Sequence, residues 1–270
     1  MKISVIIPSY KPQSYLWECL DSLRKQTFPF ENFEIILVLN GCKEPYENQI
    51  LDYLTKYPDL QVNFVQIDQG GVSNARNIAL DMAKGEYVTF IDDDDYVSPS
   101  YLEELYENVS LDTISLCYPY AFNDGNSNVQ LSYCLTDTYE YCHLQSSDLR
   151  LSSKVRKYFS GPCMKLIPMS FIQDRRFDVR FKNGEDSLFM FLISDRFRRF
   201  SITSPNAIYY RRYRSGSAVT TRRSLCMILG NNLRLSMAYS RIYFGNIFQY
   251  DLRFYLTRLL GQFRTLVVNI

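Results

Sequence analysis

Short apolar runs alternate with helix-spaced apolar residues along the first hundred residues of the chain. Four such runs predict strands, at residues 3–8, 34–39, 62–67 and 87–91. Between the first two runs, apolar side chains at i, i+3, i+4 and i+7 predict one buried helix face, formed by Leu16, Cys19, Leu20 and Leu23. Two further helices are expected, over residues 46–57 and between Gly71 and Gly85.

This alternation predicts a mostly parallel central sheet with flanking helices, an α/β architecture. In such sheets, ligands bind in a crevice beyond the carboxyl ends of the strands. Three segments fall at this edge, namely Pro8 to Tyr10, Asn40-Gly41 and Asp92 to Asp95. Neither GxGxxG nor GxxxxGK[ST] occurs, which argues against the usual dinucleotide-binding fold and against a P-loop.

Composition limits the class of protein. A chain of 270 residues, 46% of them hydrophobic and 15% aromatic, can fold as one sizeable α/β domain with an appended region. Its seven cysteines include no CxxC pair, which favours reduced thiols over a disulfide framework or a zinc site. His143 is the only histidine, so a multi-histidine metal site is excluded. We expect His143 to play no chemical part.

The first residues already read as a strand, and no apolar stretch reaches the ~18 residues that span a bilayer. We therefore expect no signal peptide and a cytoplasmic protein. From Leu225 onward the chain reads as a helical extension that mixes arginines with aromatic residues. Such helices can lie on an anionic membrane, which would place the protein peripherally on the inner face. The alternatives are packing against the rest of the chain or against a second subunit in a homodimer.

The net charge of +1 hides a strong asymmetry. Residues 1–149 hold 8 Lys and Arg against 23 Asp and Glu, a net charge of −15, whereas residues 150–270 hold 22 against 6, a net charge of +16. The basic part could bind phosphates, an anionic membrane or nucleic acid, or it could pair with the acidic part. We expect no nucleic acid partner, because no recognition-helix or stacking motif is present and the acidic half would repel phosphates.

Four adjacent acids, Asp92 to Asp95, directly follow the apolar run that ends at Ile91. Adjacent carboxylates repel one another unless a cation or basic groups offset their charge. Their oxygens suit hard divalent ions such as Mg²⁺ or Mn²⁺. The run therefore indicates a metal site at the end of a strand, and the alternative is a solvated acidic turn before the next helix.

Several segments together resemble the family 2 glycosyltransferases of the GT-A fold. In the first hundred residues these segments are SVIIPSY at residues 4–10, CLDSL at 19–23 with Gln26 and Thr27, GGVSNARN at 70–77, GEYV at 85–88 and FIDDDD at 90–95. Weaker echoes follow in K165-L166, in G184-E185-D186 and in R212-YRSGS-217. The resemblance implies a GT-A domain over residues 1–222 and a helical C-terminal extension over 223–270. Within the domain, residues 1–110 would bind the nucleotide-sugar and residues 111–222 the acceptor.

The resemblance also implies an activity. We expect an inverting glycosyltransferase that moves a sugar from a nucleotide diphosphate sugar to a glycan or lipid-linked acceptor, in surface polysaccharide biosynthesis. UDP is the expected nucleotide by family prevalence. The alternative is a non-catalytic nucleotide- or carbohydrate-binding module on the same fold.

Site roles follow from the same likeness. Asp94 is the expected direct ligand of Mg²⁺ or Mn²⁺, while Asp92 reaches the ribose or the metal through water. Asp93 and Asp95 are expected to orient the loop or contact the donor sugar, unless they are only solvated. Asp186 is the expected general base and Glu185 the runner-up, the alternative being helix-start carboxylates favoured by the macrodipole.

The remaining expected donor contacts come from both halves of the chain, and they are Pro8, Tyr10, Asn40, Arg76, Arg212, Arg214 and Ser217. Arginine forks match phosphate oxygens, although a solvated basic loop is the alternative for Arg212 and Arg214. Arg76 either contacts the donor or pairs with Asp92. Many family members carry an acidic pair after the second strand, where this chain has Asn40, so the amide of Asn40 is the candidate for the base contact.

Overall fold

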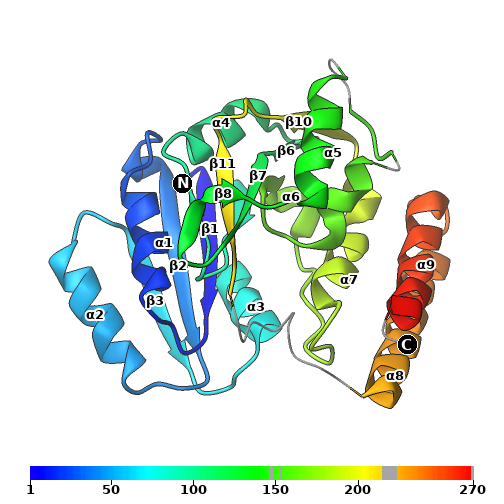
Figure 1. Ribbon diagram of the computed structural model, residues 1–270, viewed down its shortest axis with the longest axis horizontal. Helices are drawn as coiled ribbons and strands as arrows, with labels where there is room; N and C mark the ends of the chain where they lie inside the picture. The colour runs from blue at the N-terminus through cyan, green and yellow to red at the C-terminus, as the bar shows by residue number, and fades with distance from the viewer. Residues whose placement is uncertain (146–148, 153, 215–223, 269–270) are drawn as a thin grey trace.

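The computed structural model describes residues 1–145, 149–152, 154–214 and 224–268, with backbone alone at 225 and from 263 on. The predicted alternation of strands and helices is confirmed in the first hundred residues (Figure 1). Its elements are β1 (Ile3–Ser9), α1 (Tyr15–Arg24), β2 (Phe33–Asn40), α2 (Tyr46–Lys56), β3 (Val62–Ile67), α3 (Val72–Met82) and β4 (Tyr87–Phe90).

The elements that follow are shorter and less regular. They are β5 (Tyr96–Val97), α4 (Tyr101–Asn108), β6 (Thr113–Leu116), β7 (Tyr118–Asn123), β8 (Asn126–Gln130), α5 (Cys134–His143), β9 (Lys165–Pro168), α6 (Met169–Ile172), α7 (Glu185–Leu192), β10 (Arg199–Ile202) and β11 (Ile208–Tyr213). Single 3₁₀ turns lie at Phe30–Asn32, Val155–Ser160 and Ser194–Arg196. The chain ends in two long helices, α8 (Leu225–Gly245) and α9 (Leu252–Val268).

Within the described residues, the larger sheet has seven strands in the order β10-β6-β9-β4-β1-β2-β3. The four predicted strands pair in parallel, with β1 in the middle between β2 and β4. Only β9 runs against its neighbours β4 and β6. The carboxyl ends of β1, β2 and β4 therefore meet at one edge, as the sequence pattern predicts.

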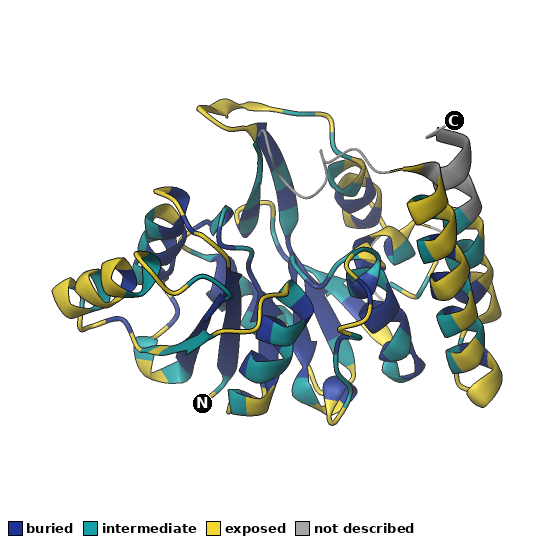
Figure 2. Ribbon diagram, turned by 90° about the horizontal axis from the view of Figure 1, so that it is seen from below, coloured by how far each residue is buried: buried dark blue, intermediate teal, exposed yellow. Residues whose placement is uncertain are grey.

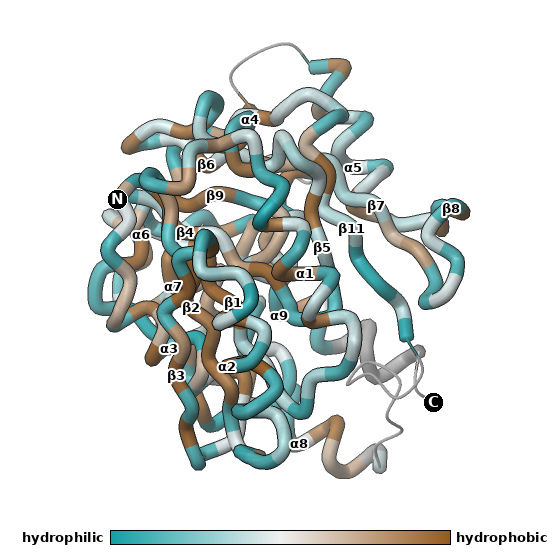
Figure 3. The backbone as a smooth tube through the Cα atoms, turned by 90° about the vertical axis from the view of Figure 1, so that its left-hand side faces the viewer, coloured by the Kyte–Doolittle hydropathy of each residue, from teal (hydrophilic) through white to brown (hydrophobic). Residues whose placement is uncertain are grey.

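Both faces of this sheet are buried, which explains its nearly continuous apolar strands. In β1 the side chains of Ile3, Val5 and Ile7 pack with α1 and α4, whereas Ile6 packs on the opposite face with Ala75 and Ala79 of α3. Figure 3 accordingly shows hydrophobic residues along the central strands. A rigid core thus holds the carboxyl edge in place.

A smaller sheet stands beside the carboxyl edge and has, among the described residues, the order β5-β11-β7-β8. Its strand β5 comes directly after the acidic run, and β11 pairs with it in antiparallel register. The chain therefore passes from the larger sheet to the smaller one at the acidic run itself.

The helices α8 and α9 form a hairpin against α7, at the side of the molecule opposite to α2 (Figure 1). Leu235, Tyr239 and Phe254 are buried in the same core as α7, while the outer faces of both helices are exposed (Figure 2). The C-terminal extension is thus helical, as expected. Within the described part of the chain, no helix combines the length and apolarity needed to cross a bilayer.

Candidate active site

The four acids after β4 alternate between two environments. Asp93 and Asp95 are buried, whereas Asp92 keeps 43% of its side chain exposed and Asp94 is half-buried. The inward pair carries structural hydrogen bonds, because Ser9 donates to Asp93 over 2.6 Å and Tyr209 donates to Asp95 over 2.7 Å. Asp92 and Asp94 are therefore the members that the crevice can use.

Asp95 fastens the smaller sheet to the larger one. Besides the hydroxyl of Tyr209, its carboxylate accepts a hydrogen bond from the backbone N–H of Arg212 at 2.7 Å. Burial and the nearby charge of Asp94 raise its pKa well above the ordinary value. The expectation that Asp95 orients this loop thus has a physical basis, while the same expectation for Asp93 rests on its bond to Ser9.

Arg76 connects the acidic run to the second half of the chain. Its guanidinium donates to Asp92 at 2.9 Å and to Asp186 at 2.5 Å, although these two acids lie 94 positions apart along the chain. The side chain of Arg76 is buried, and its guanidinium also lies over the ring of Phe177. Pairing with Asp92 was one of the two alternatives expected for Arg76, and the structure adds Asp186 as a second partner.

Asp186 and Glu185 open helix α7 directly after Gly184. Gly184 has φ = +81°, a left-handed conformation that favours glycine, and it turns the chain into the helix. The side chain of Asp186 is 31% exposed, whereas Glu185 is buried and its Oε2 has no hydrogen-bond partner among the described residues. Burial and then the charge of Asp186 raise the pKa of Glu185 to about 7.

The pKa of Asp186 is also raised. Burial is the main cause, and the charge of Arg76 opposes it. A carboxylate with a raised pKa that still reaches solvent is a suitable proton acceptor near neutral pH. The geometry therefore fits Asp186 better than Glu185 to the role of base, because Glu185 is more deeply enclosed.

Arg212 and Arg214 approach the acidic run from β11. Arg214 donates to the carboxylate of Asp94 at 2.6 Å, and Arg212 donates through Nε to the backbone oxygen of Asp94 at 2.8 Å. The guanidinium of Arg212 further pairs with Glu18 and Asp124. Neither arginine is a solvated loop residue here. Ser217 lies outside the described residues.

The ends of β1 and β2 lie beside the acidic run at the same edge of the sheet. Pro8 is buried, while Tyr10 is 54% exposed, with its ring against Gly41. Asn40 has a different task from the expected base contact. It is buried, its amide donates to the backbone oxygen of Ser9 at 2.7 Å, and its oxygen accepts from the N–H of Gly71 at 2.8 Å. Since both ends of this amide are engaged, Asn40 ties β1 to the start of α3.

The described residues contain no group of three or more His, Cys, Asp or Glu side chains arranged to hold a metal ion. Of the four acids after β4, Asp92 and Asp94 keep part of their side chains open to solvent. Mg²⁺ commonly binds one or two carboxylates together with substrate phosphates, so a pair of acids fits this mode. Burial, and then the charge of Asp92, raise the pKa of Asp94, a strain that a bound cation would relieve.

Two side chains of the site carry no clear signal in the sequence. Tyr209 donates to Asp95 and accepts from the N–H of Asp92 at 3.2 Å, yet it reads only as one of many tyrosines. Lys165 is fully buried below the site, where it donates to the backbone oxygens of Gly161 and Cys163. Burial lowers its pKa to about 8. In the sequence, Lys165 is marked only by its place in the segment Lys165-Leu166, which resembles the family pattern.

The chain is similar to two glycosyltransferases and to a teichoic acid biosynthesis protein from three bacteria. It is 29% identical to the minor teichoic acid biosynthesis protein GgaB of Bacillus subtilis over 80% of its own length, and 31% identical to the glycosyltransferase GlyG of Streptococcus pneumoniae over 83%. It is 28% identical to TarS of Staphylococcus aureus, a poly(ribitol-phosphate) β-N-acetylglucosaminyltransferase, over 82%. The chain spans 74% of GlyG, but only 23% of GgaB and 37% of TarS.

The fold is also that of a solved structure. The crystal structure of TarS residues 1–349 in complex with UDP-GlcNAc superposes with a TM-score of 0.71 at 24% identity, covering 100% of this chain and 71% of that one. The expected fold class is therefore confirmed. Residues 4–175 match the family described as glycosyl transferase family 2. The chain belongs to this family.

Proposed function

We propose that the chain is an inverting glycosyltransferase that uses a nucleotide diphosphate sugar. The observation that carries this proposal is the double ion pair of Arg76, which holds Asp92 and Asp186 on one guanidinium. Asp92 belongs to the acids that would receive the diphosphate, and Asp186 is the candidate base. An inverting transfer needs the base and the groups that bind the departing diphosphate on opposite sides of one sugar. The guanidinium of Arg76 lies between the two carboxylates that would serve these functions.

In the proposed reaction, Asp186 accepts the proton of the acceptor hydroxyl as its oxygen forms a bond to the anomeric carbon of the donor sugar. The bond from that carbon to the diphosphate breaks, and the nucleotide diphosphate leaves. Asp92 and Asp94 would hold a divalent cation, Mg²⁺ or Mn²⁺, which when bound neutralises the charge on the departing diphosphate. Arg214 pairs with Asp94. If Asp94 binds the cation, the guanidinium of Arg214 would be free to pair with the departing diphosphate.

We infer that the donor is a UDP-sugar and that the acceptor belongs to a surface polysaccharide. TarS was solved with UDP-GlcNAc and is named as a poly(ribitol-phosphate) β-N-acetylglucosaminyltransferase, and GgaB is named as a teichoic acid biosynthesis protein. Tyr10, exposed at the end of β1, is the side chain best placed to stack on the base. On this proposal residues 1–110 bind the donor, residues 111–222 receive the acceptor, and residues 223–270 support both.

We also propose that the helical hairpin contacts an anionic membrane, where a lipid-linked acceptor would be found. The tip between α8 and α9 exposes Phe244, Ile247 and Phe248, the last to 95%. Arg241 and Arg253 flank this tip, and Asp251 is the only acid from residue 224 on. Exposed apolar side chains beside arginines suit the interface of an anionic bilayer.

Vesicle binding tests the membrane contact. The full chain should sediment with vesicles of phosphatidylglycerol and phosphatidylcholine, and Phe248→Ser should weaken this binding severalfold, with Leu111→Ser as the exposed control elsewhere. A concentration-dependent dimer that Phe248→Ser dissolves, without vesicle binding, would instead assign the tip to a second copy of the chain.

Donor turnover tests the central proposal. Wild-type protein with Mn²⁺ should release UDP from a UDP-sugar, faster when an acceptor is present. Asp186→Asn should lower acceptor-dependent turnover by roughly 10²–10⁴-fold while donor binding persists, because a base contributes about that much. Asp195→Asn, which removes a buried acid paired with Arg175 away from the site, controls for loss of folding. If Asp186→Asn retains full turnover, another group is the base. If wild-type protein binds the UDP-sugar but releases no UDP, the chain is a binding module.

A further inference from the structure

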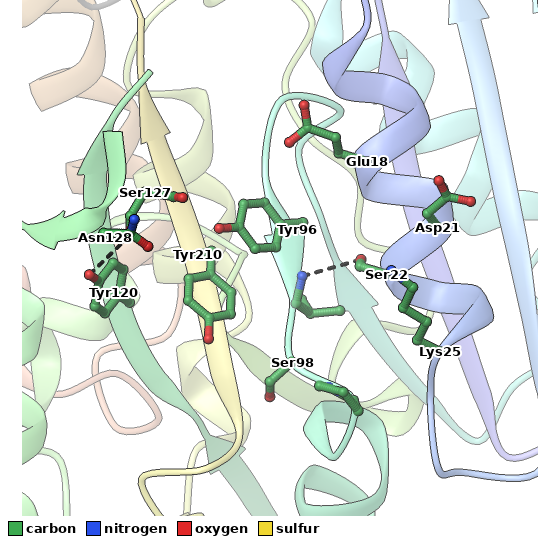
Figure 4. Close-up of a pocket in the computed structure, with 12 residues that line it drawn as sticks. Glu18, Asp21, Ser22, Lys25, Tyr96, Ser98, Tyr120, Ser127, Asn128 and Tyr210 are labelled. Carbon is green, nitrogen blue, oxygen red and sulfur yellow. Dashed lines mark hydrogen bonds between the residues drawn. The ribbon is translucent and has the colours of Figure 1, made fainter. Parts of the chain in front are cut away.

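A pocket lies between helix α1 and the smaller sheet, and none of the described residues that line it belongs to the candidate active site (Figure 4). Its volume is about 650 Å³, within the range of ligand sites. Tyrosines of three strands, Tyr96, Tyr120 and Tyr210, form one wall. The opposite wall is α1, with Glu18, Asp21 and Lys25.

Arg212 stands between this pocket and the acidic run. Successive side chains of a strand point to opposite faces, and β11 shows this directly. The hydroxyl of Tyr209 reaches the buried Asp95 on one face, whereas the ring of Tyr210 lines the pocket on the other. Arg212, two positions after Tyr210, bonds the backbone of Asp94 and the carboxylate of Glu18 at once. The pocket therefore borders the acidic run, from which Arg212 and Glu18 divide it.

The tyrosines form an aromatic platform. The rings of Tyr96 and Tyr210 stack with centroids 4.5 Å apart at 15°, and Tyr120 tilts against Tyr210 at 5.3 Å. All three are half-buried, so each keeps part of its surface open. Stacked rings lose little conformational freedom when a ligand binds, which favours them as binding surfaces.

The rest of the lining is polar and carries charges of both signs. Ser127 and Asn128 of the β8 strand are exposed at the rim, and Ser98 lies at the far end. Glu18 pairs with Arg212, and Asp21 pairs with Arg24. Lys25 is the one cation among the described lining residues, so the pocket offers no cluster of cations to a phosphate-rich chain or a nucleotide. A purely apolar ligand would leave these polar groups unpaired. Aromatic faces beside carboxylates, hydroxyls and an amide instead match a sugar, which has apolar C–H faces and many hydroxyls.

We propose that this pocket binds an uncharged saccharide segment of the acceptor glycan, distant from the sugar that receives the transfer. The proposal rests on the proposed function, which supplies the reason for a glycan to be nearby. The pocket would hold a growing chain while its end reaches past Arg212 and the acidic run to Asp186. Longer acceptors would then bind more tightly than short ones, because both sites are engaged at once.

The first test measures binding directly and needs no turnover. Chito-oligosaccharides of two to six residues are titrated against the full chain, with the chemical shifts or fluorescence of the tyrosines as readout. Tyr210→Ala should weaken binding of the longer oligosaccharides by about tenfold, as expected for loss of one aromatic contact. Asn128→Ala, on an exposed strand where folding is not at risk, should weaken it severalfold. Tyr141→Ala, an exposed tyrosine of α5, is the matched control.

The second test separates this inference from the proposed function. Donor hydrolysis without acceptor should be equal in wild type, Tyr210→Ala and Asn128→Ala, while the KM for a long acceptor rises in both variants. Oligosaccharide binding that the pocket variants leave unchanged, or no binding at all, overturns the pocket. A wild-type protein that binds oligosaccharides through Tyr210 but never turns over a donor overturns the proposed function and leaves the pocket standing.

Discussion

The two halves of the candidate active site are built in different ways. The first half brings Tyr10, Asn40 and the acidic run to one edge through three neighbouring parallel strands. The second half brings Asp186 and Arg214 through contacts that span about a hundred positions of the chain or more. The acids of the first half also hold the second half in place, because Asp95 and Asp94 bind β11 without a substrate.

The largest effect is expected where the two halves meet, at Asp94. Asp94→Asn removes a candidate metal ligand and the charge that pairs with Arg214. We expect turnover of a UDP-sugar with Mn²⁺ to fall by at least about 100-fold, since electrostatic stabilisation of a leaving group is of this size. Because burial and Asp92 already raise the pKa of Asp94, thermal stability at pH 7 should fall little. Asp81→Asn, at an exposed acid paired with Arg176, is the control.

A result in which Asp94→Asn loses stability but keeps turnover would reverse this assignment. The acid would then serve only to hold β11, and the first half of the site would be structural throughout. Melting curves recorded beside the turnover assay distinguish the two cases.

The second largest effect is expected at Gly184, where helix α8 packs against the start of helix α7. A methyl group at Gly184 would meet Leu235 Cδ1 at 2.5 Å, in a residue whose φ is +81°. Gly184→Ala should cost roughly 1–3 kcal/mol of stability from the left-handed backbone, with a further cost from the clash. It should also lower turnover, since Gly184 opens the helix that carries Asp186.

Gly125→Ala is a matched control for this variant. Gly125 has φ = +79° in the turn between β7 and β8, and among the described residues nothing lies within 4 Å of its added methyl group. It carries the backbone cost alone. If the two variants lose the same stability and the same activity, α8 does not hold the base in position.

The sequence predicted the first half of the site more fully than the second. The four strands and three helices follow from local periodicity, so the edge that holds Asp92 to Asp95 was expected in the right place. The alternation within the acidic run was not, because it depends on Tyr209 and Arg212, which arrive from more than a hundred positions away. Nor could spacing reveal that the buried amide of Asn40 is used by Ser9 and Gly71.

The pH dependence of turnover distinguishes the two acids of the second half. Burial and then the charge of Asp186 raise the pKa of Glu185 to about 7, so Asp186 is already ionised when Glu185 loses its proton. The pKa of Asp186 is set by burial, Arg76 and Asp92, and Glu185→Gln leaves these in place. The acid limb of kcat/KM should therefore stay within roughly a few tenths of a pH unit of the wild-type limb, with the plateau rate retained. Loss of the plateau would make Glu185 the base.

The pH dependence of thermal stability is a second, independent test of the Glu185→Gln variant. The pKa of Glu185 is raised in the folded protein, so its contribution to stability is present below its unfolded pKa and is lost as pH rises through about 7. Glu185→Gln removes this loss. The Tm of the variant relative to wild type should therefore increase between pH 5 and pH 8, whereas Glu107→Gln, at an exposed glutamate of α4, should show no such trend.

The smallest effect is expected at Tyr239 of α8, which touches the second half through one hydrogen bond. The Ser187 hydroxyl can donate to the backbone oxygen of Gly184, at 3.1 Å, and it lies 2.6 Å from the hydroxyl of Tyr239. When Ser187 donates to Gly184, Tyr239 must be the donor to Ser187. Tyr239→Phe keeps the ring packing and leaves the Ser187 oxygen short of one donor, at a cost of about 0.5–1.5 kcal/mol.

Because Gly184 keeps its own bond to Ser187, turnover by Tyr239→Phe should stay within about twofold of wild type, as one modest hydrogen bond allows. Ser187→Ala removes both bonds and should lower stability further. A Tyr239→Phe variant that melts like wild type but loses turnover severalfold would show that α8 acts on the position of Asp186 and not on folding. The C-terminal hairpin would then belong to the active site as much as the parallel strands do.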